Sequence, residues 1–108
     1  MKNLITILLL FFAVNISAQN IKLIHINAKW NQDNNYPYLR GLKNVDIQMA
    51  FLEDQTKELK SKIKAVPVIL LIDKKGKPRG QWQADLTFKL TVTQEEVQEW
   101  VNRILIDQ

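Results

Sequence analysis

The sequence predicts an α/β domain in which helices cover a mixed β-sheet, with the elements in the order strand, helix, strand, helix, strand, strand, helix. Three segments support this prediction. The apolar run at positions 68–72 has the length of a strand and is typical of one buried on both faces. Part of the segment 21–28 alternates apolar and polar residues, as in a strand. Apolar residues recur at helical spacing over positions 94–105.

The length of 108 residues suffices for one domain, since no second core could be built from the remainder. We expect residues 1–18 to be a secretory signal peptide, because a short basic start precedes an apolar run over positions 4–14 and the small-residue site Ile16-Ser17-Ala18. The apolar run is shorter than the roughly 20 residues that span a bilayer. Cleavage after Ala18 would leave a single domain over residues 19–108, secreted or periplasmic, without a stable membrane anchor.

The absence of cysteine excludes disulfides, thiolate nucleophiles and thiolate-bound metals. Three aspartates, Asp33, Asp46 and Asp85, match no known spacing of carboxylate ligands, so neither a metal nor a cofactor is predicted. The formal net charge of +4 is mild for a chain of this size. Most basic residues are scattered, so nucleic acid is not expected as a partner.

The first strand and helix are predicted over positions 21–42. Positions 21–28 form the strand, and the polar segment 30–35, rich in Asn and Asp, forms a loop that opens a helix over 36–42. Pro37 is tolerated in the first turn of this helix, and Gly41 lies near its end.

The second strand and helix are predicted over positions 45–62. Apolar and polar residues alternate in the first half of 45–52, which indicates a strand. Positions 53–62 then form a helix with Leu59 and Ile63 on its inner side. A right-handed crossover makes the first two strands parallel neighbours.

The third strand, at positions 68–72, begins at Pro67, whose bond to Val66 is a candidate cis peptide. The charged turn at 74–77 leads into an antiparallel hairpin partner over 79–84.

The segment after the hairpin is followed by the clearest helix of the chain. Alternating residues from Leu86 to Val92 indicate either a continuation of the hairpin or an extra edge strand, and the pattern does not choose between them. Thr93 and Glu96 form a capping box at the start of a helix from about Gln94 to Leu105.

Three places in this order of elements together resemble the thioredoxin-like superfamily. They are the strand-to-tryptophan junction Ala28-Lys29-Trp30, the step Val66-Pro67-Val68 into a buried strand, and the turn at 73–77. The resemblance covers nearly all of the domain and implies a thioredoxin-like mixed sheet. In that superfamily the tryptophan precedes a Cys-x-x-Cys pair at a helix N-terminus, and a cis-proline lies opposite the pair.

Asparagine stands at both positions where the superfamily has cysteine, Asn31 and Asn34. Thiol–disulfide exchange needs a thiolate, and an amide cannot replace it. The resemblance therefore implies a redox-inactive relative rather than an oxidoreductase. The first helical segment is shorter than usual in the superfamily, and the stretch between Trp82 and Thr93 is longer.

The remaining function implied by the resemblance is binding of a polypeptide or an envelope partner. Superfamily members hold extended peptides through backbone hydrogen bonds beside the cis-proline, with the tryptophan as an apolar platform. The residues expected to bind are Trp30, Asn31, Gln32, Asp33, Asn34, Val66 and Pro67.

Two alternative functions belong to other classes. One is an enzyme of non-redox chemistry that uses His25 or the Asn31–Asn34 loop, although a single histidine in mid-strand favours a buried structural role. The other is a structural protein that pairs with a partner through an edge strand near Leu86–Val92.

Overall fold

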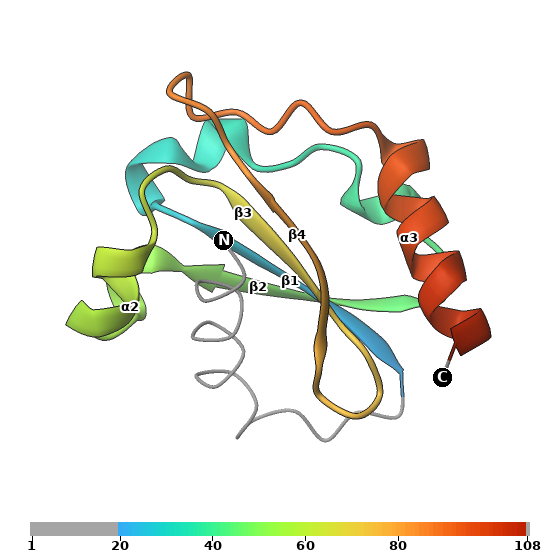
Figure 1. Ribbon diagram of the computed structural model, residues 1–108. Helices are drawn as coiled ribbons and strands as arrows, with labels where there is room; N and C mark the ends of the chain where they lie inside the picture. The colour runs from blue at the N-terminus through green and yellow to red at the C-terminus, as the bar shows by residue number, and fades with distance from the viewer. Residues whose placement is uncertain (1–19, 108) are drawn as a thin grey trace.

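The computed structural model describes residues 20–107, and the predicted signal segment lies outside them. Four strands form one mixed sheet in the order β2-β1-β3-β4 (Figure 1). β1 pairs in parallel with β2 and antiparallel with β3, and β3 pairs antiparallel with β4. The predicted α/β class, the parallel first pair and the antiparallel hairpin are therefore confirmed. The strands are β1 Ile21–Asn27, β2 Val45–Phe51, β3 Val68–Ile72 and β4 Pro78–Gln83.

The two helices of more than one turn lie on opposite faces of the sheet. Alternate residues of β1 and β3 point to opposite faces, because side chains alternate along a strand. On one face, Ile21 and Leu23 pack with Val97 and Val101 of α3, which spans Gln94–Asp107. On the other face, Leu59 of α2, Lys57–Lys62, packs in the second cluster of the core. All five residues of β3 are buried, as predicted.

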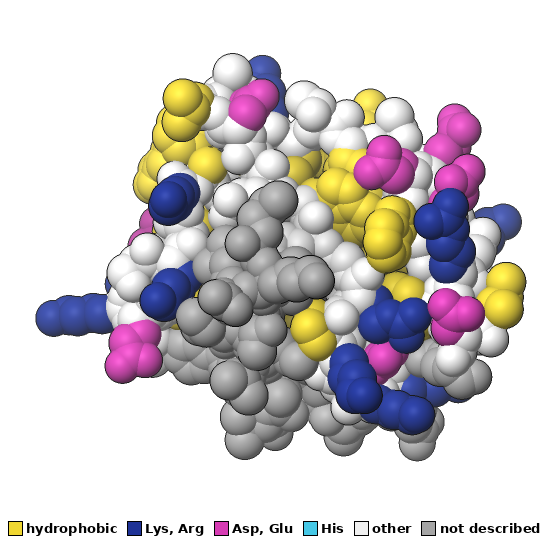
Figure 2. All heavy atoms as spheres, in the orientation of Figure 1, with side chains coloured by type: hydrophobic (Ala, Val, Ile, Leu, Met, Phe, Trp, Pro, Cys, Tyr) yellow, Lys and Arg dark blue, Asp and Glu magenta, His cyan; other side chains and the backbone are white. Residues whose placement is uncertain are grey.

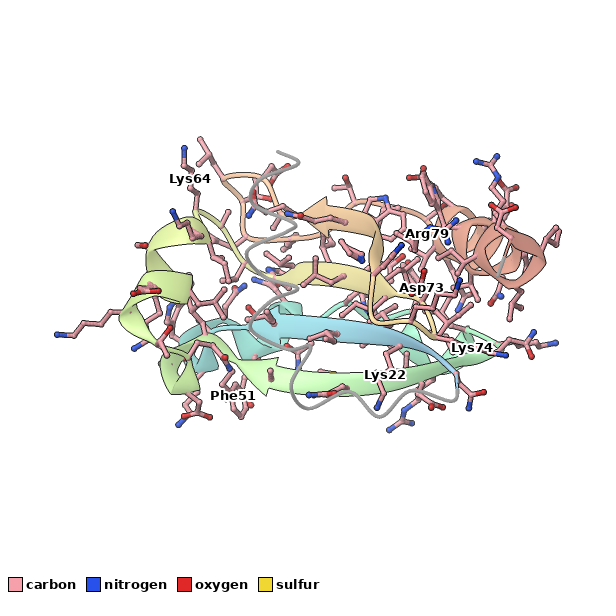
Figure 3. All side chains as sticks on the ribbon, turned by 60° about the horizontal axis from the view of Figure 1, so that its bottom comes forward. Lys22, Phe51, Lys64, Asp73, Lys74 and Arg79 are labelled. Atoms are coloured by element: carbon pink, nitrogen blue, oxygen red, sulfur yellow. The ribbon has the colours of Figure 1, made fainter. Side chains whose placement is uncertain are left out.

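The hairpin turn after β3 is fixed by Asp73, a buried carboxylate. One oxygen, Oδ1, accepts hydrogen bonds from the backbone N–H groups of Lys75 and Lys77, each at 2.9 Å. Gly76 has a φ of 82°, which a residue without Cβ adopts freely. The Arg79 guanidinium lies 3.4 Å from the other Asp73 oxygen, so the turn is tied to the start of β4 (Figure 3).

The predicted helix over 36–42 is wrong. Two short 3₁₀ helices stand in this region, η1 over Lys29–Asn34 and η2 over Leu39–Gly41. Tyr36 lies between them and is held at both ends: its backbone N–H donates to His25 Nε2 at 3.1 Å, and its hydroxyl donates to the Val92 carbonyl at 2.6 Å. These tertiary bonds hold Tyr36 outside either 3₁₀ helix, so a continuous α-helix does not form.

The predicted helix over 53–62 is split into two pieces. A 3₁₀ turn, η3 over Leu52–Asp54, is followed by Gln55 in an extended conformation with φ −92° and ψ 166°. Thr56 then caps α2, because its Oγ1 accepts a hydrogen bond from the Leu59 N–H at 3.3 Å. Gln55 and Thr56 are both extended, so the α-helix begins only after the threonine cap.

The segment Leu86–Val92 forms neither of the two predicted structures, because it is not a strand at all. Asp85 accepts hydrogen bonds from both the backbone N–H and the hydroxyl of Thr87, which makes a tight turn. Phe88 follows with a φ of 61°, a left-handed conformation that interrupts any ladder. The alternative function, in which a partner pairs with an edge strand near Leu86–Val92, therefore has no strand here to pair with.

α3 begins where the capping box predicted it. Thr93 Oγ1 accepts from the Glu96 N–H at 3.1 Å, which is half of the expected reciprocal pair. The Glu96 carboxylate instead accepts from Trp82 Nε1 at 2.9 Å and links the helix to β4. Among residues 20–107, no helix has the length and apolar character needed to cross a membrane.

Candidate binding site at the Asn31 loop

The predicted binding residues come together at one end of the sheet. β1 and β3 are antiparallel, so the end of β1 lies beside the start of β3, where Ile26 pairs with Val68. The loop that leaves β1, residues 29–35, is here named the Asn31 loop. It lies against the segment that enters β3, where the Val66–Pro67 bond is cis as predicted.

Asn27, the last residue of β1, holds the loop through side-chain hydrogen bonds. Its buried amide Nδ2 donates to the Asn31 carbonyl at 2.9 Å and to Asn35 Oδ1 at 2.7 Å. Its Oδ1 accepts from the Ala28 N–H at 2.9 Å. A single side chain therefore bonds to the residue before the loop, to its middle and to its end, so the loop is ordered in this conformation.

Asn31 is buried, with only 4% of its surface exposed, and joins three parts of the chain. Its Nδ2 lies 3.0 Å from Asn27 Oδ1, 3.3 Å from the Val66 carbonyl and 3.1 Å from the Phe88 carbonyl. Its Oδ1 accepts from Asn34 Nδ2 at 2.8 Å. Two amide hydrogens thus serve three acceptors, so Nδ2 has no hydrogen left to donate to a ligand in this conformation.

The seven predicted site residues divide into a buried and an accessible set. Asn31, Val66 and Pro67 are buried and hold the site together. Trp30 is 67% exposed, and its neighbours Gln32 and Asp33 are exposed as well. The half-buried Asn34 lies between the two sets. The surface that can meet another molecule is therefore Trp30 with the outer residues of the loop.

A segment that the sequence did not assign to the site crosses it. Residues 84–92, here named the strap, run from the end of β4 over the Asn31 loop toward α3. The Phe88 ring meets Trp30 edge-to-face with centroids 5.1 Å apart, and the ring also packs on the core beneath. Hydrophobic side chains gather at this end of the molecule, at the upper left of Figure 2. In the sequence, the only sign of the strap was the unusual length of the stretch between Trp82 and Thr93.

The strap is tied down along its length. The Ala84 N–H donates to the Pro67 carbonyl at 3.0 Å, and the Val92 carbonyl accepts from the Tyr36 hydroxyl at the other end. Between these ends, hydrogen bonds from Thr87 to the Asp85 carboxylate lower the pKa of Asp85 and favour its charged form. Leu86, in the same turn, is 87% exposed.

His25 does not reach a surface. Its side chain is fully buried, and burial lowers its pKa, so the neutral form is favoured. Nε2 accepts the Tyr36 N–H, which places the ring proton on Nδ1, a buried atom without a hydrogen-bond partner. A general base needs access to its substrate, and His25 has none here.

Tyr36, the partner of His25, is also held by its hydroxyl. Burial, assisted by the nearby Tyr38 and Glu96, raises the pKa of Tyr36 to about 12. The phenol therefore stays protonated and donates to Val92.

Residues 20–107 contain no group of three or more His, Asp or Glu side chains arranged to hold a metal ion.

Two hollows lie apart from the contact between Trp30 and Phe88. One, of about 510 Å³, separates η2 from the edge strand β2 and is lined in part by Ile47 and Met49. The other, of about 360 Å³, lies beside the edge-to-face pair Trp82 and Trp100, whose centroids are 6.2 Å apart. Neither hollow brings a nucleophile together with a base, so neither suggests a reaction.

Comparison with known proteins gives a fold and no family. No family model matches the chain, and no curated protein matches it. Among solved structures, a similar chain described as "Crystal structure of a designed protein" has a TM-score of 0.55 and 15% sequence identity, over 85% of this chain and 82% of that chain. At this identity the likeness concerns the fold alone, a mixed α/β arrangement.

Proposed function

We propose that the protein is a redox-inactive, thioredoxin-like domain that binds an extended polypeptide at the Asn31 loop. One observation carries the proposal. Asn31, at the position of the superfamily's first cysteine, lies 3.3 Å from the carbonyl of Val66, the residue before Pro67, and beside the exposed Trp30. This proximity supports the proposal, because the resemblance implies that the loop after the tryptophan lies opposite the cis-proline, here with amides in place of the thiols.

The chemistry of the asparagines supports binding over catalysis. Asn34 donates to Asn31 at 2.8 Å, so the two side chains that replace the cysteines face one another. Neither can form or break a sulfur–sulfur bond. Amides donate and accept hydrogen bonds at any ordinary pH, which suits them to hold a peptide backbone.

The rigidity of the loop supports binding in a second way. The Lys29 N–H donates to both carboxylate oxygens of Glu53 at 3.0 Å, and Asn27 holds the rest of the loop. A loop that is ordered before binding loses little conformational entropy when a partner arrives. Trp30 supplies the large apolar surface that commonly dominates such contacts.

The place of action remains part of the proposal. Residues 1–18 have the pattern of a secretory signal, so the partner is expected to be a secreted or periplasmic polypeptide.

The proposal is tested by selection from a random peptide library displayed on phage, with the purified protein immobilised. We expect enriched peptides to lose at least about tenfold in affinity for Trp30→Ala, since a central interface tryptophan commonly contributes 2 kcal/mol or more. Ile106→Ala, which removes an even more exposed apolar side chain from α3, should bind unchanged. No enrichment, or equal losses for both variants, would contradict the proposal. Turnover in an insulin-disulfide reduction assay would contradict its redox-inactive part.

A further inference from the structure

We infer that the strap occupies the Asn31 site as an internal ligand, and that the external partner is an extended segment whose aromatic side chain takes the place of Phe88. This inference rests on the proposed function and names the partner's chemistry and the regulation of the same site. Its basis is that one residue of the strap, Phe88, makes both kinds of contact expected of a bound peptide.

The first contact is made by the backbone. The Phe88 carbonyl accepts from Asn31 Nδ2 at 3.1 Å, and the same amide lies 3.3 Å from the Val66 carbonyl. Asn31 therefore bridges the strap to the segment that enters β3. An external peptide would present a carbonyl to the same amide, because a peptide backbone carries an acceptor at every residue.

The second contact is made by the side chain. The Phe88 ring meets Trp30 edge-to-face at 5.1 Å and covers part of the core beneath the site. An aromatic pair prefers this geometry over a face-to-face sandwich. Any ligand that uses the same place must bring a ring of similar size, which sets the class of partner as a segment with Phe, Tyr or Trp.

The conformation of Phe88 indicates a contact that can be released. Its φ of 61° lies in the left-handed region, which is unfavourable for a bulky residue. The neighbouring Leu86 is 87% exposed and gains nothing from the closed strap. A partner can therefore displace the ring and relieve the backbone at the same time, while bonds at Ala84 and Val92 keep the strap attached.

The experiment uses a synthetic peptide of the strap sequence, ADLTFKLTV, as the probe. Binding is followed by two-dimensional NMR of the indole and asparagine side-chain signals. We expect Phe88→Ala to bind the peptide at least tenfold more tightly than the wild-type protein, with shifts at Trp30 and Asn31. The control peptide ADLTAKLTV should not bind, and Leu86→Ala should behave as wild type. Unchanged signals of Trp82 and Trp100 report that each variant is folded.

The outcomes separate this inference from the proposed function. Equal affinity of wild type and Phe88→Ala for the probe, or no binding to either, overturns the inference, whereas the phage selection decides the proposed function. A second measurement needs no variant at Phe88. In the wild-type protein saturated with a library-selected peptide, the nuclear Overhauser contact between the Phe88 and Trp30 rings should vanish, and its persistence would overturn the inference.

Discussion

Replacement of Asn31 by alanine tests whether the buried amide holds the site together. The change removes side-chain bonds to Asn27, Val66 and Asn34, all of them buried or half-buried. At about 1 kcal/mol net for each bond, the expected loss is about 3 kcal/mol. That is a large part of the 5–15 kcal/mol that stabilises a typical domain. The bond to the Phe88 carbonyl is left out of the sum, because Nδ2 has only two hydrogens for its three acceptors.

The assay is urea unfolding followed by circular dichroism, with Gln32→Ala as the matched control. Gln32 neighbours Asn31, but its single side-chain bond, to the Lys29 carbonyl at 3.0 Å, is exposed, so a change within about 0.5 kcal/mol is expected. A loss below about 1 kcal/mol for Asn31→Ala would refute the reasoning. Asn31→Asp keeps the shape of the side chain but presents oxygen to the acceptors, so at pH 7 it should lose at least as much as Asn31→Ala.

Three further predictions concern groups outside the loop. Burial lowers the pKa of His25, so the stability that its neutral form contributes is present above the unfolded value of 6.5 and is lost as the pH falls below it. The free energy of unfolding should therefore decrease by up to about 1.4 kcal/mol per pH unit below 6.5 in the wild type, and this decrease should be absent from His25→Gln. The pKa of Tyr36 is raised to about 12, so the stability that its protonated form contributes below the unfolded value of 10.0 is lost as the pH rises through 12. In Tyr38→Phe the one remaining phenol should still titrate above 10 by ultraviolet absorbance, because burial is the main cause of the shift, and titration at 10 would contradict this. Thr93→Ala should lose about 1 kcal/mol in urea unfolding, because the Glu96 N–H loses its cap, while Thr91→Ala, an exposed change in the strap, should lose less than half of that.

The strands and the last helix could be predicted because their patterns coincide with their burial. β3 is five apolar residues long and has all five buried, and α3 begins at the threonine that its capping box marks. The prediction of a helix over 36–42 was wrong because local sequence does not reveal the hydrogen bonds of Tyr36 with His25 and Val92. Val92 is 56 residues away in the chain. Local propensity cannot register such a partner.

The structure of the strap, which covers the candidate site, could not be predicted from local sequence either. Its alternation of apolar and polar residues is that of a strand, yet the turn at Asp85 and the left-handed Phe88 make a loop of it. Trp30 could be placed at the site from its position after β1, whereas the burial of Asn31 could not. Asparagine is typical of loops, and this one is buried because acceptors 35 and 57 residues away converge on its amide.

Under the proposed function, the loss of redox chemistry and the closure of the site follow from one property of asparagine. The amide of Asn31 has two strong donor hydrogens and an acceptor oxygen, and it uses all of them, toward the strap, the β3 segment and Asn34. A thiol at the same position offers one weak donor, which could not hold a strap and a loop at the same time. Asparagine thus removes the nucleophile and supplies the hydrogen bonds that keep Phe88 in place. A partner of this site must therefore compete with the protein's own chain for the Asn31 amide, and its affinity is set by the difference between the two contacts.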